Sequence, residues 1–538
     1  MVQEAFSQQG NLLVEAYEAF LKETKKDQTQ ERFRAQSVFG VFAFLYEKLR
    51  NVVEYKGEHL LRRISIERTL KRLRRTSRTP GAIAERLVRE LIWGRYVENE
   101  SISLQKMDVL SQRIAKYQAL RGELFQEYAD PALKVEWDEW LLGVESSEIE
   151  ETLVPSFVRD VMVQAMYAWF TSRFVWTNDK IDLKEKEVQL FIAVHRSLAK
   201  SDAQLTIYHL LKLYVPQWDH LGTESFSYIA RELPTLRKKI EVHLAFSDSH
   251  KVFRLVQKYT APFLILSDVL DRVKEDAHEV LSNQELLERE IRFICVTKYA
   301  QLRQRITHGI VRSIIYIFIT KVLFALLLEL PYEYYFLSSV RLFPLAVNIV
   351  LPPFLMFLVG LTIKIPGEEN TKRIINRVND VLFGEEPREK AVIQFHVSRR
   401  NAVVADIFTF IYVVLFLALV GGIAYILHLL EFSIVSSMIF FAFLSLVLLF
   451  GYRVKWQAQD LLVTGKEEGL IGQSVNILTL PFLNVGLWLS AGLAKINIFT
   501  FLLDVIIDAP LKTMVGAVEA WVTFMREKRE EVVEVPQE

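Results

Sequence analysis

Cysteine is nearly absent from the sequence, which has Cys295 alone among its 538 residues. A lone cysteine excludes an intrachain disulfide and any metal cluster built from several thiolates of one chain. This usage is typical of a protein whose main domain faces a reducing cytosol. The first residues, MVQEAFSQQGNLLVEAYEAF, also lack the basic segment and apolar core of a signal peptide. We therefore expect any membrane insertion to depend on internal segments.

Familiar catalytic motifs are missing as well. The sequence has no G-x-x-x-x-G-K-[ST], no G-x-S-x-G and no H-E-x-x-H, and the fragment Gly465-Lys466 lacks the upstream glycine of a phosphate-binding loop. These absences argue against a P-loop ATPase, a serine hydrolase and a zinc metalloprotease. Whether the protein is an enzyme stays open, although the absence of these motifs favours a protein that is not one. We predict no cofactor.

One charged stripe has a spacing that metal ligands can use. On a helix with 100° per residue, Asp268, Asp271, Glu275 and His278 fall within about 80° of one face. Arg272 lies among them, however, as does Lys274. The pattern therefore favours a solvated charged face, and we predict no metal site.

The alternating apolar pattern of β-strands does not persist anywhere in residues 1–300. Apolar residues there recur at intervals of three and four, which indicates helices. The segments ADPALK and VESSEIEETLVPS, within 128–155, interrupt this periodicity and suggest a domain boundary. We expect an all-α fold, in which a large soluble helical domain is joined by a long stalk helix to a polytopic transmembrane helical domain.

Later stretches of the chain are long, nearly uncharged and rich in Leu, Ile, Val and Phe, as bilayer spans require. We predict spans at about 313–330, 342–363, 407–427 and 434–452. The expected parts are a helical subdomain over 1–150, a second helical region with the stalk over 151–305, a transmembrane hairpin over 306–365, a cytoplasmic loop over 366–402, a second hairpin over 403–456, a cytoplasmic loop over 457–474, a re-entrant hairpin or fifth span over 475–507, and an amphipathic tail over 508–538.

Orientation follows from the basic residues beside the spans. Arg303, Arg305 and Arg312 precede the first span, and the segment 364–400 carries a further group of lysines and arginines. The turns at 331–341 and 428–433 offer Arg341 as their one strong base. The excess of bases predicts that the first two segments are cytoplasmic and that the turns lie outside.

A proline-free segment leads into the first span. From Gln284 to Leu330 the chain has no proline and only Gly309 as a glycine, so one helix of about 70 Å fits this segment. Its first half carries an apolar stripe of Leu287, Ile291, Cys295, Tyr299, Leu302 and Ile306. The segment is either an ordinary connector or a lever that carries movement into the membrane.

Three polar residues form a candidate intramembrane site. Lys321 lies about 12 Å into an 18-residue apolar run, too deep for its side chain to reach water, so it needs a partner or must be neutral. Asp406 is the first choice of partner, because helical side chains lean toward the N-terminus. The second is the pair of carbonyls at Asn348 and Ile349, which the Pro352-Pro353 pair would leave without donors. A structural pair and a transport or gating site both remain open.

The densest basic run, LRRISIERTLKRLRRTSR, covers residues 61–78. On a helix, Arg68, Lys71, Arg72 and Arg75 present a candidate patch for a membrane surface or an anionic partner. Acidic groups of the same protein fit this charge best, followed by anionic lipid headgroups. Nucleic acid is disfavoured because no helix-turn-helix, zinc or stacking motif accompanies the run.

The whole pattern indicates a polytopic integral membrane protein of the plasma (inner) membrane with its N-terminal domain in the cytoplasm. We expect a membrane-anchored helical scaffold or sensor that binds a protein partner, because over half the chain precedes the first span. The alternative is a transporter or channel regulated by that domain, which Lys321 and the proline-interrupted second span favour. A lipid-modifying membrane enzyme comes third. The sequence names no substrate and no oligomeric state.

Overall fold

A computed structural model describes residues 8–28, 31–35, 57–76, 79–128, 130–173, 181–222, 225–336, 341–384, 402–459, 461–463 and 479–489. The described residues form helices and no named β-strand, which confirms the all-α prediction. The N-terminal helices are α1 (Gln8–Gln28), α3 (Glu58–Thr76), α4 (Pro80–Trp93), α5 (Leu104–Glu127), α6 (Pro131–Leu153), the π-helix η1 (Val158–Met162), α7 (Val163–Arg173), α8 (Leu183–Leu198), α9 (Ala203–Tyr214), the 3₁₀-helix η2 (Trp218–His220), α10 (Phe226–Leu244), α11 (Ser249–Gln257), α12 (Thr260–Val273), the 3₁₀-helix η4 (Lys274–Asp276) and α13 (Ala277–Ser282).

The later helices are α14 (Gln284–Phe324), the π-helix η5 (Ala325–Glu329), α15 (Leu330–Phe336), α16 (Leu342–Leu361), α17 (Glu368–Leu382), α18 (Ala402–Leu429), α19 (Ile434–Gln459) and the short apolar helix Thr479–Leu489. Among the residues that the structure describes, four helical stretches are long and apolar enough to cross a membrane, namely Gln284–Phe336, Leu342–Leu361, Thr409–Leu429 and Ile434–Trp456. Each contains or overlaps one predicted span. Most of the predicted region 475–507, and all of 508–538, lie outside the described residues.

The two interruptions predicted within 128–155 have different outcomes. ADPALK lies where α5 ends at Glu127 and α6 begins at Pro131, whereas most of VESSEIEETLVPS continues α6 to Leu153. The helix runs unbroken from Pro131 to Leu153, begins at an Asp130 side chain that caps the amide of Ala132, and packs against α3, α5 and α9. Residues 140–150 are buried on every side, including Glu145, Glu148 and Glu150. A helix buried all round has no amphipathic period, which explains why VESSEIEETLVPS interrupts the periodic pattern of the sequence. The domain boundary at residue 150 stays a prediction.

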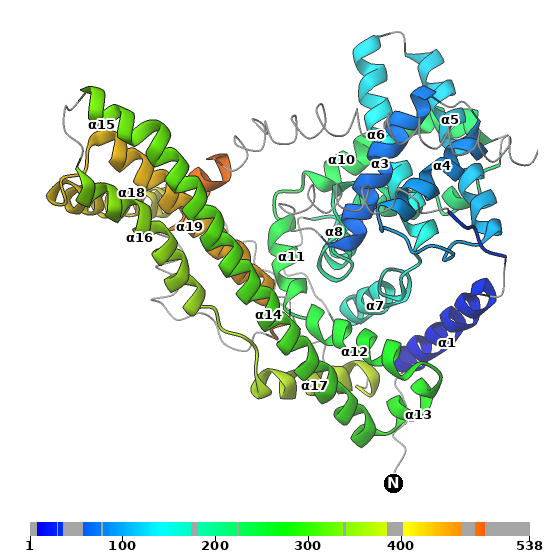
Figure 1. The fold of residues 1–538 in the computed structure, drawn as a ribbon. Coiled ribbons are helices and arrows are strands. Elements are labelled where there is room, and N and C mark those ends of the chain that lie inside the picture. Colours follow the sequence, from blue (N-terminus) through cyan, green and yellow to red (C-terminus); the bar gives the residue numbers. More distant parts are fainter. Residues whose placement is uncertain are drawn as a thin grey trace, which may run out of the picture.

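Helix α14 joins the N-terminal helices to the apolar ones. It starts at Gln284, as predicted, with Asn283 capping the amides of Glu285 and Leu286. In Figure 1 it runs diagonally from the α12–α13 corner to the far end of the molecule, beside α16 and α19. The predicted stripe is buried but divided between two cores. Leu287, Ile291 and Cys295 pack with the N-terminal helices, whereas Leu302 and Ile306 pack with α16 and α19.

The second half of α14 forms a bundle with α16 and α19, which we call the apolar bundle. Its buried residues recur every four positions, as Ser313, Ile317 and Lys321 on α14 and as Pro344, Asn348, Pro352 and Met356 on α16. Rows of residues spaced by four form the ridges that pack one helix against another. Glycines allow a close approach: a Cβ added at Gly451 would lie 2.5 Å from Val359 Cγ1.

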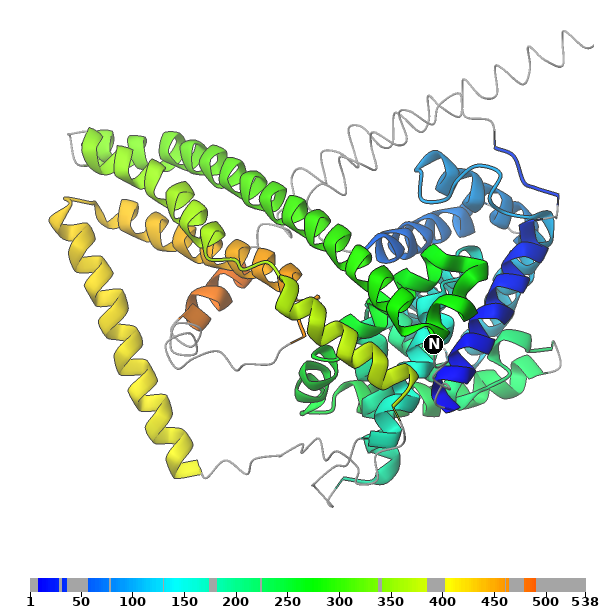
Figure 2. The ribbon, with the colours of Figure 1, turned by 90° about the horizontal axis from the view of Figure 1, so that it is seen from below.

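Helix α18 stands apart from the apolar bundle. Its most apolar stretch is 6% buried, against 44% for that of α19. Leu427 and Ile423, near its C-terminal end, pack with Phe432 and Phe440, and the Phe416 ring meets the Phe482 ring at 5.5 Å. Figure 2 shows the helix in yellow diverging from the others.

Three segments next to the apolar helices pack with the N-terminal helices, namely the first half of α14, helix α17 and residues 461–463. Helix α17, which the sequence interpretation treated as part of a loop, packs against α1, α12 and α14. Asn370 on α17 donates to Tyr299 Oη and to the Leu461 carbonyl, each at 2.8 Å, and accepts from the Val463 amide at 2.8 Å. One side chain thus fastens α14, α17 and residues 461–463. We call this the Asn370 junction.

Candidate functional site in the apolar bundle

Lys321 forms a buried ion pair within its own helical stretch. Its Nζ lies 2.6 Å from Oε1 of Glu329, eight residues later. Both residues have 0% exposure. The Lys321 ammonium also lies 5.0 Å from the centre of the Phe443 ring on α19, within reach of a cation–π attraction. The lysine is therefore neutralised inside the apolar bundle and does not extend to a surface.

The π-helix η5 explains how residues eight apart can meet. In a regular α-helix they lie about 80° apart around the axis and about 12 Å apart along it. A π-helix has more residues per turn, so each residue rotates less, and η5 brings Glu329 back toward the face of Lys321. Pro331 provides the cause, since it has no N–H to donate to the Leu327 carbonyl four residues back.

Asn348 on α16 joins the ion pair from the neighbouring helix. Its Nδ2 lies 2.9 Å from each carboxylate oxygen of Glu329 and 3.3 Å from the Ser436 carbonyl on α19. Its Oδ1 has no hydrogen-bond partner among the described residues. Lys321, Glu329 and Asn348, which we call the buried triad, therefore link all three helices of the apolar bundle.

A second carboxylate lies one turn beyond the buried triad. Glu333 on α15 is 1% exposed and accepts a hydrogen bond from the Arg341 amide at 3.1 Å. The Arg341 side chain donates to the Glu431 carbonyl at 3.0 Å, which ties the turn after α15 to the turn before α19. The end of the apolar bundle farthest from the N-terminal helices is thus closed by polar contacts.

The buried triad can hold helices together or exchange a proton. Lys321 and Glu329 neutralise each other, so removing either one leaves an uncompensated charge in an apolar interior. A proton arriving at Glu329 would break its bond to Lys321. Since all three residues are fully enclosed, the structure holds this site closed to water.

The structure brings together two of the three residues predicted for this site. Lys321 and Asn348 both contact Glu329, but Asp406 is exposed near the start of α18. The prediction of Asp406 as the partner of Lys321 is therefore wrong, because a carboxylate on the lysine's own helix takes that place. The Asn348 carbonyl is not the partner either, since Asn348 contributes its side-chain amide. Helix α16 continues through Pro352 and Pro353.

Glu329 was missed even though it lies in the same apolar run as Lys321. A regular helix would place the two side chains on different faces, so helical periodicity does not predict their pairing. The signal was Pro331, two residues after Glu329, because a proline near a span end disturbs the turn before it.

The basic patch predicted on α3 faces acids of the same chain. Lys71 pairs with Glu139 at 3.4 Å, and Arg72 pairs with Glu90. Arg68 donates to Ser65 Oγ at 3.4 Å, and Arg75 is exposed. These pairs agree with the first of the three partners considered for the basic run. Binding of this patch to anionic lipid stays a prediction.

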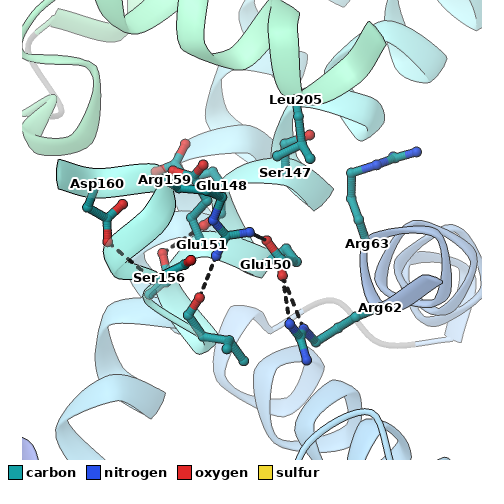
Figure 3. A network of polar contacts seen from close by, with 12 residues as sticks. Arg62, Arg63, Ser147, Glu148, Glu150, Glu151, Ser156, Arg159, Asp160 and Leu205 are labelled. Atoms are coloured by element: carbon teal, nitrogen blue, oxygen red, sulfur yellow. Dashed lines mark hydrogen bonds and ion pairs between the residues drawn. The ribbon is translucent and has the colours of Figure 1, made fainter. Parts of the chain in front are cut away.

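Deeper bases of α3 meet the buried glutamates of α6 (Figure 3). Arg62 contacts Glu150 at 3.0 Å, and Arg159 of η1 pairs with the other oxygen of the same carboxylate. Burial raises the pKa of Glu150, and Arg159 and Arg62 oppose this rise. Lys116 of α5 pairs with Glu148 at 2.6 Å. These buried ion pairs hold α6 against α3, α5 and η1, which is a structural role.

The charged stripe considered as a metal site is bound by other bases. Asp268 pairs with Lys298 at 2.8 Å, and Glu275 pairs with Lys25 at 2.5 Å. Among the residues that the structure describes, no group of three or more His, Cys, Asp or Glu side chains is placed to hold a metal ion.

Comparison of the chain with models of protein families, with curated proteins and with solved structures found no match.

Proposed function

We propose that the protein is a membrane-anchored helical scaffold or sensor, whose N-terminal helices bind a protein partner in the cytoplasm and are mechanically coupled to the membrane spans. The Asn370 junction is the observation that carries this proposal. It joins the first span's helix, the segment after the second span and the segment after the fourth. A simple tether would need one connection, whereas coupling needs several.

The shared core supports the same proposal. Ile374, Val378 and Leu382 of α17 and Val463 lie in one apolar cluster with Leu287 and Cys295 of α14 and with residues of α1, α7, α8 and α12. A packed core resists continuous deformation, so a shift of the spans moves its contents as a unit. The lever interpretation of α14 is therefore favoured over that of a connector.

Hydrogen exchange in lipid nanodiscs tests the coupling. In nanodiscs of two lipid thicknesses, we expect the exchange rates of α12 and α17 to differ, because a change in the tilt of the spans reaches them through the junction. The Asn370→Ala variant should lose most of this dependence while its spans remain protected. Thr362→Ala, at an exposed position just after α16, is the control and should behave as wild type.

Equal exchange of α12 and α17 at both thicknesses in the wild-type protein would contradict the sensor proposal. A dependence that persists in Asn370→Ala would show that α14 alone carries the coupling. In that case the junction would not be the coupling element.

Transport is the second candidate, and the buried triad favours it. Ionisable residues inside spans often mark ion or proton pathways, and π-turns often occur at functional sites. The enclosure of Glu329 means that transport would require the apolar bundle to open.

Proteoliposomes test the transport candidate. A transporter or channel should move protons or monovalent cations faster than empty liposomes under a membrane potential, and Glu329→Gln should abolish the difference. Equal flux for wild type, Glu329→Gln and empty liposomes would exclude proton and cation transport as the function. The buried triad would then have a structural role.

A further inference from the structure

A shallow groove on α14 has two chemically different ends. Its volume is about 470 Å³, and it is lined by His308, Val311, Arg312, Ile315, Tyr316 and Ile319. Tyr316 packs edge-on against Phe450 of α19 at 5.7 Å, which fixes one wall. The basic residues lie at the end nearer the N-terminal helices, and the apolar residues follow along the predicted span.

The bases beside this groove lack acidic partners among the described residues. Arg305, His308 and Arg312 are exposed and make no ion pair with any part of the chain that the structure describes. At 100° per residue they fall within about 60° of one another around the helix. The contrast with α3 is informative, because Lys71 and Arg72 each pair with a glutamate. The basic cluster on α14 therefore carries charge that no described acid neutralises, in contrast to Lys71 and Arg72 on α3.

The position of the groove limits what can occupy it. Arg312 directly precedes the apolar run, so it lies where a bilayer interface is expected. Ile319 is about 10 Å further along the axis. Val311, Ile315 and Ile319 are 48%, 53% and 60% exposed. An occupant must therefore be anionic at one end and apolar along its length.

We propose that this face of α14 binds one anionic phospholipid in the leaflet on the side of the N-terminal helices. Its phosphate lies against Arg305, His308 and Arg312, and one acyl chain follows Ile315 and Ile319. Basic pockets beside transmembrane helices bind anionic headgroups through charge and hydrogen bonds. The site moves the expected lipid contact from α3 to α14, and it rests on the apolar helices crossing a bilayer. Because α14 reaches both cores, the lipid would also stabilise the helix that links them.

Native mass spectrometry of the full chain tests the proposal. The probes are phosphatidylglycerol, which is anionic, and phosphatidylcholine with the same acyl chains. We expect one phosphatidylglycerol to be retained in preference to phosphatidylcholine, with the preference weakening as salt rises. The double variant Arg305→Gln/Arg312→Gln should lower the affinity about fivefold for each base removed. Arg312→Lys should keep most of it.

Two matched controls separate the groove from general surface charge. Lys71→Gln/Arg72→Gln removes the same charge from α3 and should leave retention unchanged. Ile315→Trp fills the apolar part of the groove and should reduce retention with all bases intact, whereas Ile411→Trp makes the same substitution at an exposed position of α18 and should not.

Several results would overturn the proposal. These are equal retention of both lipids, full retention by Arg305→Gln/Arg312→Gln, or a loss caused equally by the α3 variant. Full retention by Ile315→Trp would show that the bases attract lipid without a groove. A negative result for lipid binding would not affect the proposed coupling between the spans and the N-terminal helices, because the nanodisc experiment compares lipid thickness and not lipid charge.

Discussion

Lys321 shows how a charged residue is kept inside an apolar helix. Glu329 neutralises it, Asn348 satisfies both oxygens of that carboxylate, and the Phe443 ring faces the ammonium. The position of Lys321 in the sequence showed that a partner was needed, and it favoured Asp406 over the carbonyls at Asn348 and Ile349. Pro331 is the sequence signal for Glu329, but the local π-helix that brings Glu329 to Lys321 is visible only in the packed structure.

A double-mutant cycle tests the ion pair. Lys321→Met and Glu329→Gln should each lower the free energy of unfolding by about 3–5 kcal/mol, because each leaves a buried charge unpaired. The double variant should cost far less than the sum. Unfolding in detergent, followed by circular dichroism, measures all three. Asp406→Asn is the control and should change stability by less than about 0.5 kcal/mol, independently of Lys321. Additive effects of Lys321→Met and Glu329→Gln would contradict the pair.

His195 gives the N-terminal helices a dependence on pH. Burial, with His209 and Lys212 nearby, holds the pKa of His195 well below its usual 6.5. The unfolded chain therefore binds a proton at a higher pH than the folded chain does. The associated stability is complete above pH 6.5 and is lost as pH falls below it.

Thermal unfolding between pH 7.5 and pH 5 measures this effect. The midpoint should fall with pH in the wild-type protein. His195→Phe keeps a ring against Phe191 and His209 but cannot titrate, so its midpoint should fall less steeply. Part of the slope should remain, because burial and Arg159 also lower the pKa of His59. Identical slopes in the two proteins would exclude His195 as the cause.

Helices were predictable where the pattern was periodic or uniformly apolar. Helix α14 begins at Gln284, the first residue of the proline-free segment, and each predicted span coincides with an apolar helix. The second half of α6 shows no helical periodicity in the sequence, because its glutamates point inward and pair with buried bases of neighbouring helices. Helix α17 was hidden in a basic segment that resembled a loop.

Glycine contacts between helices give a matched pair of variants. A Cβ at Gly486 would lie 2.5 Å from the Ser445 carbonyl oxygen on α19, whereas a Cβ at Gly422 on α18 would have nothing within 4 Å. Gly486→Ala should therefore cost about 1–3 kcal/mol by overpacking. Gly422→Ala should be neutral or stabilising by up to about 1 kcal/mol. Unfolding midpoints in detergent compare them. Equal effects would mean that the helix Thr479–Leu489 does not pack on α19 in this way.

At the scale of the whole molecule, hydropathy predicted the apolar helices but not how the two regions are joined. The sequence suggested one long helix between a helical domain and the spans. The structure adds α17 and residues 461–463, which meet Tyr299 at Asn370. Such contacts join residues far apart in the chain, and no local pattern reports them. They bring together the first half of α14, α17 and the residues that follow α19, on one side of the apolar helices, as a four-span topology requires (Figure 1).

Cysteine accessibility in intact cells tests this topology most directly. In a Cys295→Ala chain, single cysteines at Tyr335 and Leu430, in the two turns far from the N-terminal helices, should react with a membrane-impermeant maleimide from outside. Cysteines at Asp380, on α17, and at Leu462 should react only after the membrane is opened. The reverse pattern would place the N-terminal helices outside the cell, and a mixed pattern within either pair would contradict the four-span arrangement itself.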